Sequence, residues 1–485
     1  MADARAVLHL SPFDQTIGRI YVRKLYGFAF PHDALRPRAI LALRRGIQAA
    51  VARWPFLAGH VAPARNGPHL NGVDLIYHTR PRHPDADDGS GILTIRVLSP
   101  VEFPWNYADL VDAGVPPSAL RKEVLSAVPE HPGPDDTRPA FSVQANFFPG
   151  GLILCVASHH SVFDGNSVRQ FLVTFAHAIR NPGSVQHAGE QVPKRLDYSA
   201  TVAAQDCRGA SLETLSEFAA RPATLTSSPR PPRATTRVLT FAASTIDTLK
   251  ADVTAHVHRI AGPDAWVSTF NCVAALVWVA VVRARRARVP PSATVRLGCA
   301  VDIRQKHSPR LPSEYFGNAI VHTVAVATAS ELLDHSSSLD AASPDAGISP
   351  ATIAHAAARI RAALAAVDDA YVKQRLCVFS RLADPTHVPR AYKAALDMPS
   401  TGLDLSSWLD QGADVDFGIP GCDPPAPQWV RKTFSAHEGV VNILPRKGGS
   451  RGGEAWEVLL GLSADDMSTV CAPQELGAWT LRVVE

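Results

Sequence analysis

The sequence has no long hydrophobic segment and little net charge. Its longest apolar run, residues 272–282, is far shorter than the ~20 residues that cross a bilayer, and residues 1–15 lack the apolar core of a signal peptide. We therefore expect a cytoplasmic protein without a membrane partner. A net charge of only +3 gives no basic field of the kind that binds nucleic acid, so we expect no nucleic-acid partner.

Paired cysteines and phosphate-binding loops are also absent. The seven cysteines are scattered and form no C-x-x-C pair, so they predict free thiols in a reducing compartment rather than a disulfide framework or a thiolate zinc site. No glycine-rich nucleotide-binding fingerprint follows a predicted strand, which leaves hydride transfer and nucleoside triphosphate chemistry without support.

What is present is a globular composition, with 46% hydrophobic and 19% charged residues. A chain of 485 residues exceeds what one hydrophobic core usually supports, so we expect two domains. The proline-rich segment 221–237 is the predicted crossover linker. It would join an N-terminal domain, residues 1–220, to a C-terminal domain, residues 238–485.

Strand and helix patterns alternate in both halves. Apolar residues at helical spacing predict helices near residues 40–54, 168–179, 268–286 and 351–372. The stretch "FSVQANFFPGGLILCVAS" predicts two strands joined at residues 149–151. The second strand leads into a helix through the motif "HHSVFDG", so this motif lies on a strand-to-helix turn.

That motif has three possible interpretations: a metal site, a proton-transfer centre or a polar turn. Neighbouring residues at a strand end point to opposite faces, so His159 and His160 should not converge on one ion, and we expect no metal. His160, followed by Asp164 and by Gly165 to permit a tight turn, can carry a proton near neutral pH. His159 should face into its own domain. From these residues alone, proton transfer and a polar turn remain open alternatives.

A serine-hydrolase interpretation rests on "GGSRG", residues 448–452, which matches G-x-S-x-G. A nucleophile elbow needs an apolar strand directly before it and a helix directly after it. Pro445, Arg446 and Lys447 precede this stretch, and the strand-like "AWEVLLGL" follows it. The sequence therefore predicts an exposed hairpin loop.

Several further motifs occur in a fixed order along the chain. "HHSVFDG" resembles the H-x-x-x-D-G motif of the BAHD acyl-CoA-dependent acyltransferases, and "DFGIPG", residues 416–421, resembles their D-F-G-W-G motif. Between them, "STFNCVAALVW", "VDIRQKHSPRLPSEYFGNAI" and "SSW" are similar to intervening blocks of the same superfamily, as are "LSPFDQ" and "WPFLAGH" nearer the N-terminus. The full set is most similar to the fungal branch that includes trichothecene 3-O-acetyltransferases.

This resemblance implies an α/β fold of two chloramphenicol-acetyltransferase-like domains with a channel between them. It implies that His160 is the general base and that Asp164 is a structural residue. It also implies that Arg304 pairs with a motif aspartate, either Asp164 or Asp416. The remaining candidates are Gly418 for structural support, Asn318 and Ser407 for the channel or the oxyanion, and Arg283, Arg285 and Ser268 for CoA. The arginines are alternatively cations favoured at a helix C-terminus.

The function that the resemblance implies is transfer of an acyl group, acetyl by expectation, from acyl-CoA to a hydroxyl of a hydrophobic secondary metabolite. Transfer should be direct, in a ternary complex formed by a monomer, with acyl-CoA as co-substrate and no bound cofactor. Ile419 and Pro420 depart from D-F-G-W-G and leave acceptor orientation open. The alternatives are a free-standing condensation-type domain that uses carrier-bound thioesters, and an inactive relative that binds a partner.

Overall fold

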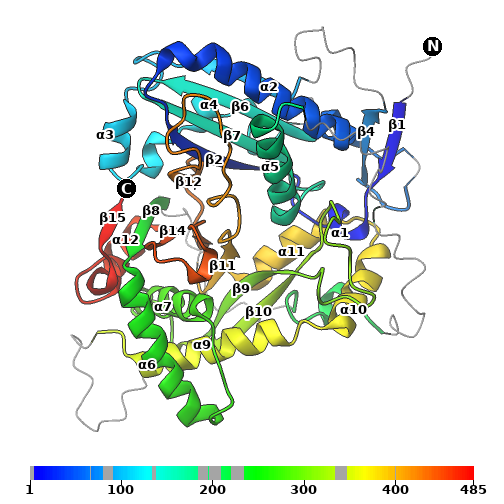
Figure 1. The fold of residues 1–485 in the computed structure, drawn as a ribbon. Coiled ribbons are helices and arrows are strands. Elements are labelled where there is room, and N and C mark those ends of the chain that lie inside the picture. Colours follow the sequence, from blue (N-terminus) through cyan, green and yellow to red (C-terminus); the bar gives the residue numbers. More distant parts are fainter. Residues whose placement is uncertain are drawn as a thin grey trace.

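The computed structural model describes residues 5–65, 67–79, 91–133, 138–183, 195, 209–219, 234–333, 347–398 and 400–485. Two sheet-and-helix halves lie one above the other, with the N-terminal half at the top of Figure 1. Most of the predicted linker lies outside the described residues, and its last four residues, 234–237, begin strand β8 (Ala234–Phe241).

The N-terminal half is built on a five-stranded sheet of order β12-β2-β7-β6-β5. The predicted hairpin is present as the antiparallel strands β6 (Phe141–Phe148) and β7 (Gly151–His159). Two predicted helices, α2 (Arg36–Arg53) and α5 (Gly165–Arg180), pack against each other and against this sheet (Figure 1). The other elements here are β1 (Arg5–His9), α1 (Pro12–Gln15), β2 (Tyr21–Ala29), β3 (His60–Pro63), β4 (Val73–His78), β5 (Leu93–Val97), α3 (Tyr107–Asp112) and α4 (Lys122–Leu125).

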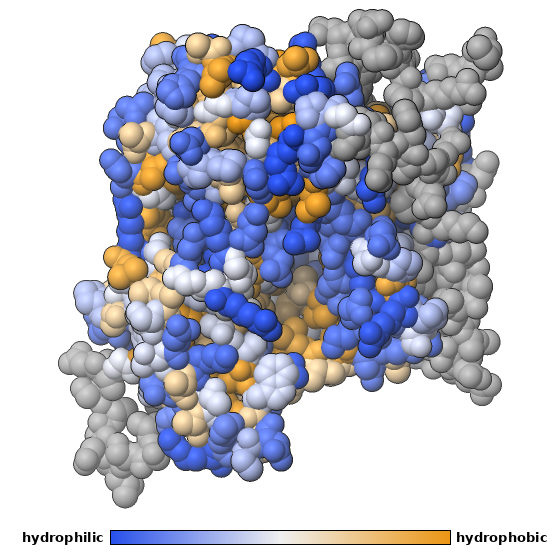
Figure 2. All heavy atoms as spheres, in the orientation of Figure 1, coloured by the Kyte–Doolittle hydropathy of each residue, from blue (hydrophilic) through white to orange (hydrophobic). Residues whose placement is uncertain are grey.

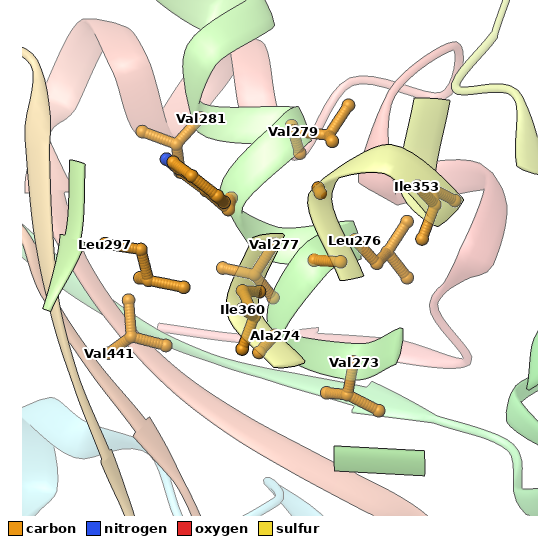
Figure 3. Packing of buried hydrophobic residues seen from close by; sticks show 14 of the residues in the cluster. Val273, Ala274, Leu276, Val277, Val279, Val281, Leu297, Ile353, Ile360 and Val441 are labelled. Carbon is orange, nitrogen blue, oxygen red and sulfur yellow. The ribbon is translucent and has the colours of Figure 1, made fainter. Parts of the chain in front are cut away.

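The C-terminal half is built on a seven-stranded sheet of order β10-β9-β11-β13-β14-β8-β15. Helix α7 (Thr269–Ala284) is apolar on every side, so it is buried between the sheet and its neighbouring helices. Figure 3 shows Val273, Leu276, Val277 and Val281 of α7 pointing in different directions into that core. The other elements are α6 (Ala243–Ala261), β9 (Thr294–Asp302), β10 (Ile320–Thr328), α8 (Ala329–Leu333), α11 (His387–Leu396), β11 (Gly402–Ser407), β13 (Val440–Ile443), β14 (Trp456–Ser463), α12 (Ala464–Val470) and β15 (Arg482–Val484).

The helix predicted over residues 351–372 is wrong as a single element. The structure has α9 (Pro350–Ala365) and then α10 (Asp369–Ser380). The side chain of Asp368 accepts a hydrogen bond from the backbone N–H of Tyr371 at 2.8 Å, which caps a new helix. The two helices also contribute to different cores, because Ile353 of α9 packs with α7 whereas Val372 of α10 packs in a separate cluster.

The two halves are not separate in sequence, because a segment of the C-terminal half returns to the N-terminal sheet. Strand β12 (Trp429–Lys432) pairs antiparallel with β2, 400 residues earlier. Phe417, in the "DFG" segment, is fully buried and makes edge-to-face contacts with Phe28 and Phe175. A boundary at residues 221–237 therefore does not divide the two cores.

The cysteines partly depart from the expectation of free thiols. Cys155, Cys272 and Cys299 are buried and free, but Cys377 is disulfide-bonded. In the described part of the chain, no helix is both long enough and apolar enough to span a membrane. The G-x-S-x-G stretch lies between the antiparallel strands β13 and β14, as predicted for a hairpin connection.

Candidate active site

His160 is the first residue after β7, and it lies at the junction of the two halves. Its Nδ1 lies 3.2 Å from the backbone oxygen of Phe163. A carbonyl oxygen only accepts, so Nδ1 carries the hydrogen and Nε2 keeps its lone pair. Burial lowers the pKa of His160, and the positive charge of Lys24 adds to this lowering. The imidazole is therefore neutral near pH 7 and can accept a proton at Nε2.

His159 has a different environment, as the alternation of the strand predicts. Its ring is 1% exposed and packs edge-to-face on Tyr21, with 5.2 Å between ring centroids. Burial lowers the pKa of His159 to about 3, and nearby cations contribute to the lowering. His159 is a neutral core residue of its own domain and does not converge with His160.

Asp164 and Arg304 form a buried ion pair across the two halves. The guanidinium donates to both carboxylate oxygens of Asp164, at 2.8 Å and 3.1 Å, and both residues are nearly fully buried. Burial alone would raise the pKa of Asp164, but the charge and hydrogen bonds of Arg304 outweigh it and lower that pKa. Asp164 also caps α5 by accepting from the backbone N–H of Ser167 at 2.9 Å. Both carboxylate oxygens of Asp164 accept hydrogen bonds from the protein, so Asp164 has a structural role, as predicted from the resemblance.

Asp416, the competing partner, does not contact Arg304. It lies at the surface, 3.4 Å from Arg180 at the end of α5. Gly418 has a φ of +58°, and a Cβ there would come within 2.4 Å of Arg180. The "DFG" segment thus holds the far end of α5 and inserts Phe417 into the core, which agrees with its predicted structural role.

Gly165 has a different surrounding from the one predicted. The sequence suggested a tight turn, but the φ of Gly165 is not positive. Instead, a Cβ at this position would lie 2.2 Å from the side-chain nitrogen of Gln411. Gly165 therefore allows a segment of the C-terminal half to approach the start of α5.

Asn318 holds the backbone of His160 in place and is not available to bind an oxyanion. Its side-chain amide donates to the backbone oxygen of His160 and to Asp14, both at 2.8 Å, and Asn318 is fully buried. Both amide hydrogens are used, so Asn318 has no donor left for an oxyanion. Asp14 was not assigned a role from the sequence. Only its position in "LSPFDQ", three residues after Ser11 as in a capping box, gave a signal.

The C-terminal half contributes residues from the end of β11 to the region that faces the N-terminal sheet. Leu403 and Leu405 face the helical core, so alternation places Ser406 and Trp408 on the other face of the sheet. Asn442 of β13 pairs with Ser406 and shares that face. Ser407, the predicted oxyanion donor, is exposed at the strand end on the side of the helical core. The geometry favours Ser406 over Ser407.

Lys24 of the N-terminal half contacts Trp408, which follows β11. Its Nζ lies 5.2 Å from the ring centroid of Trp408. Lys24 and Val156 are cross-strand partners of β2 and β7, and His160 lies four residues beyond Val156. Figure 2 shows this side of the molecule hollowed between the upper and lower halves, with hydrophobic residues in the depth of the hollow.

The predicted CoA-binding residues are engaged elsewhere. Arg283 forms two hydrogen bonds to Glu475, at 2.7 Å and 3.1 Å, and the buried Arg285 lies 3.1 Å from Asp466. Ser268 caps α7 in a capping box with Asn271. These contacts fit the alternative interpretation, in which the arginines stabilise the C-terminal end of α7.

One cluster of possible metal ligands was not found from the sequence, because His437 lies about 300 residues after the neighbours Glu130 and His131. Ligand atoms of Glu130, His131 and His437 lie within 4.8 Å of one another. The second carboxylate oxygen of Glu130 is 2.7 Å from Arg23, and Lys432 is also nearby. These two cations oppose metal binding at this place.

Comparisons with known proteins agree with this architecture. The model of the Transferase family matches residues 109–476, and that of a trichothecene 3-O-acetyltransferase-like N-terminal domain matches residues 20–179. O-acetyltransferase ptmV of Penicillium ochrochloron is 26% identical, over 98% of this chain and 96% of its own. O-acyltransferase pigD of Monascus ruber is also 26% identical, over 95% of both chains.

Solved structures show the same fold. The crystal structure of Fusarium graminearum TRI101 with coenzyme A and deoxynivalenol has a TM-score of 0.76 at 21% identity, covering 99% of this chain and 100% of that chain. The crystal structure of vinorine synthase has a TM-score of 0.61 at 16% identity, covering 98% of this chain and 97% of that chain.

Proposed function

Because the chain belongs to the Transferase family, we propose that it transfers an acyl group from acyl-CoA to a hydroxyl of a hydrophobic small molecule. The observation that carries this proposal is the neutral imidazole of His160, with Nδ1 held by Phe163 and Nε2 free to accept a proton. The acyl group we propose is acetyl, because O-acetyltransferases are among the relatives that match along most of their length. A secondary-metabolite alcohol is the proposed acceptor on the same ground.

The proposed chemistry begins with the acceptor hydroxyl at Nε2 of His160. Nε2 takes the hydroxyl proton while the oxygen bonds to the thioester carbon, and the carbonyl becomes a tetrahedral oxyanion. The oxyanion then collapses, the carbon–sulfur bond breaks, and the CoA thiolate leaves and takes the proton from the imidazolium. Asn318 and the Asp164–Arg304 pair position the loop that carries His160. Both halves of the site come from one chain, which supports the proposal of a monomeric enzyme.

The test is thiol release from acetyl-CoA in the presence of a panel of hydrophobic alcohols, with the product identified by mass. We expect release that depends on the acceptor and a product heavier by one acetyl group. Longer acyl-CoAs test the proposed acyl group, and amines of matched shape test the choice of hydroxyl. Release of thiol at the same rate with and without every acceptor would contradict the proposal.

A further inference from the structure

Lys24 is a buried lysine that forms no ion pair with a carboxylate in the described part of the chain. The residue is 2% exposed. Among the residues that the structure describes, its Nζ has no hydrogen bond or ion pair, and its contact is the ring of Trp408. An unpaired ammonium in the interior costs free energy, and a methionine or leucine would fill the same space without that cost. The charge of Lys24 is therefore not needed to stabilise the fold.

The side chain of Lys24 lies on the face of the sheet from which His160 projects. Lys24 is opposite Val156, and Val22 is opposite Ser158, in the β2–β7 ladder. Side chains alternate along a strand, so Val156, Ser158 and His160 leave β7 toward the same side as Lys24. Lys24 is close enough to contribute to the lowered pKa of His160, and Asp164 is close enough to act on Lys24.

The C-terminal half closes the other side of Lys24 with uncharged groups. Trp408 stands over Nζ, while Ser406 and Asn442 are its neighbours on the same face of β11 and β13. Val22, two residues before Lys24 in β2, packs against the cluster that contains Trp408. The ammonium is thus located between the two halves.

The titratable groups around Lys24 come from three elements. They are His160 after β7, Asp164 at the start of α5, and Lys432, its cross-strand partner on β12. The charge of Lys432 interacts with Glu130 and Arg23 instead. Burial lowers the pKa of Lys24 to about 7, and Asp164 limits the lowering. Lys24 therefore carries its charge up to neutral pH and loses it above.

We propose that the ammonium group of Lys24 stabilises the oxyanion of the acyl-transfer step. This inference rests on the proposed function and adds a second group to it. When the acceptor oxygen bonds to the thioester carbon, the carbonyl electron pair moves onto oxygen, and in this proposal the Nζ–H groups of Lys24 donate to that negative charge. No proton is transferred to the oxyanion, which returns its electron pair to the carbon as the thiolate leaves. A cation in a site with little water is suited to this task, because it needs no reorganisation during the reaction.

The first measurement is the acceptor-dependent rate of Lys24→Met, which keeps a similar unbranched side chain and removes the charged group. We expect kcat and kcat/KM to fall together by about 100 to 1,000-fold, as for loss of an oxyanion-stabilising donor. The matched control is Lys432→Met, on the neighbouring strand, which we expect to retain kcat within about 3-fold because its charge faces Glu130. An unchanged kcat in Lys24→Met, or a rise in KM alone, would overturn the inference.

Two further measurements separate this role from a structural one. Thermal unfolding of Lys24→Met should occur at the same temperature as in the wild type or higher, since an unpaired buried charge is removed. The pH profile of wild-type kcat/KM should fall above about pH 7 as Lys24 loses its proton. Lys24→Met should lack this falling limb, and Lys24→Arg should move it to alkaline pH.

The outcomes are distinguishable from those of the proposed function. A wild-type enzyme that releases thiol with an alcohol, paired with an equally active Lys24→Met, contradicts only the role of Lys24. A wild-type enzyme inactive with every acceptor contradicts both. A lower unfolding temperature of Lys24→Met with an unchanged pH profile would assign Lys24 to structure.

Discussion

At the scale of single residues, the two adjacent histidines give the most direct comparison. We expect His160→Ala to lose about 100 to 10,000-fold in kcat, because it removes a positioned base. His159→Ala should lose far less, since His159 lies in the core against Tyr21. Acceptor-dependent thiol release measures both variants, with thermal unfolding as the control for folding. Equal losses in two natively folded variants would show that the base is assigned to the wrong histidine.

A second comparison at this scale concerns the two serines of "SSW". Ser406 shares a face with Trp408 and Asn442, whereas Ser407 lies on the side of the helical core at the strand end. We expect Ser406→Ala to lower kcat by roughly 10-fold or more, as for removal of one hydrogen bond made in the transition state. Ser407→Ala should stay within about 2-fold. The reverse order of the two losses would restore Ser407 as the candidate.

The residues that sequence reasoning found are those whose roles depend on local spacing. His160 and Asp164 lie on one turn, and the resemblance supplied Arg304. Lys24 and Asn442 were not found, because their importance comes from strand pairing and from the absence of a partner charge. Neither property can be read from neighbouring residues in the chain.

At the scale of elements, the Asp164–Arg304 pair links α5 to the segment that follows β9. We expect Asp164→Asn to destabilise the fold by about 3 to 5 kcal/mol, because Arg304 is left buried without its partner. Asp416→Asn is the matched control, and its exposed pair with Arg180 should contribute less than about 1 kcal/mol. Chemical denaturation measures both. A fully stable Asp164→Asn variant without activity would show that Asp164 has a catalytic role and not a structural one.

The same pair gives a pH dependence of stability with a defined sign. The folded-state pKa of Asp164 is lowered relative to its ordinary value of about 3.9. The stabilisation is therefore fully present above pH 4 and is lost as the pH falls through the lower, folded-state pKa. The difference in unfolding free energy between the wild type and Asp164→Asn should therefore shrink as the pH falls from neutral to pH 3. A constant difference over that range would contradict the assignment.

Element boundaries were predicted well where apolar spacing and end signals agreed. Pro55 ends the pattern of α2, and residues 181–183 end that of α5. The prediction failed at residues 366–368, where apolar residues at Val367 and Tyr371 continue the helical spacing while the chain changes direction. Apolar periodicity indicates which face of a helix is buried, but it does not indicate which hydrophobic core that face packs against.

At the scale of the whole molecule, the kinetic order follows from the lack of an exposed, activated nucleophile beside His160 among the residues that the structure describes. Ser161 is fully buried, and burial raises the pKa of the Cys155 thiol to about 12. Acyl-CoA and acceptor should therefore react directly in a ternary complex, with intersecting initial-rate plots. Parallel plots, together with an acetyl mass increment on enzyme incubated with acetyl-CoA alone, would point to an acyl-enzyme.

The return of β12 to the N-terminal sheet has a consequence during synthesis. Strand β2 leaves the ribosome early, but its outer neighbour begins at Trp429, 400 residues after Ala29. At ordinary elongation rates this delay lasts roughly 20 to 80 s. During that time the nascent chain presents an unpaired strand edge of the kind that recruits other strands. Yield in cells should therefore depend on chaperones and on the speed of translation.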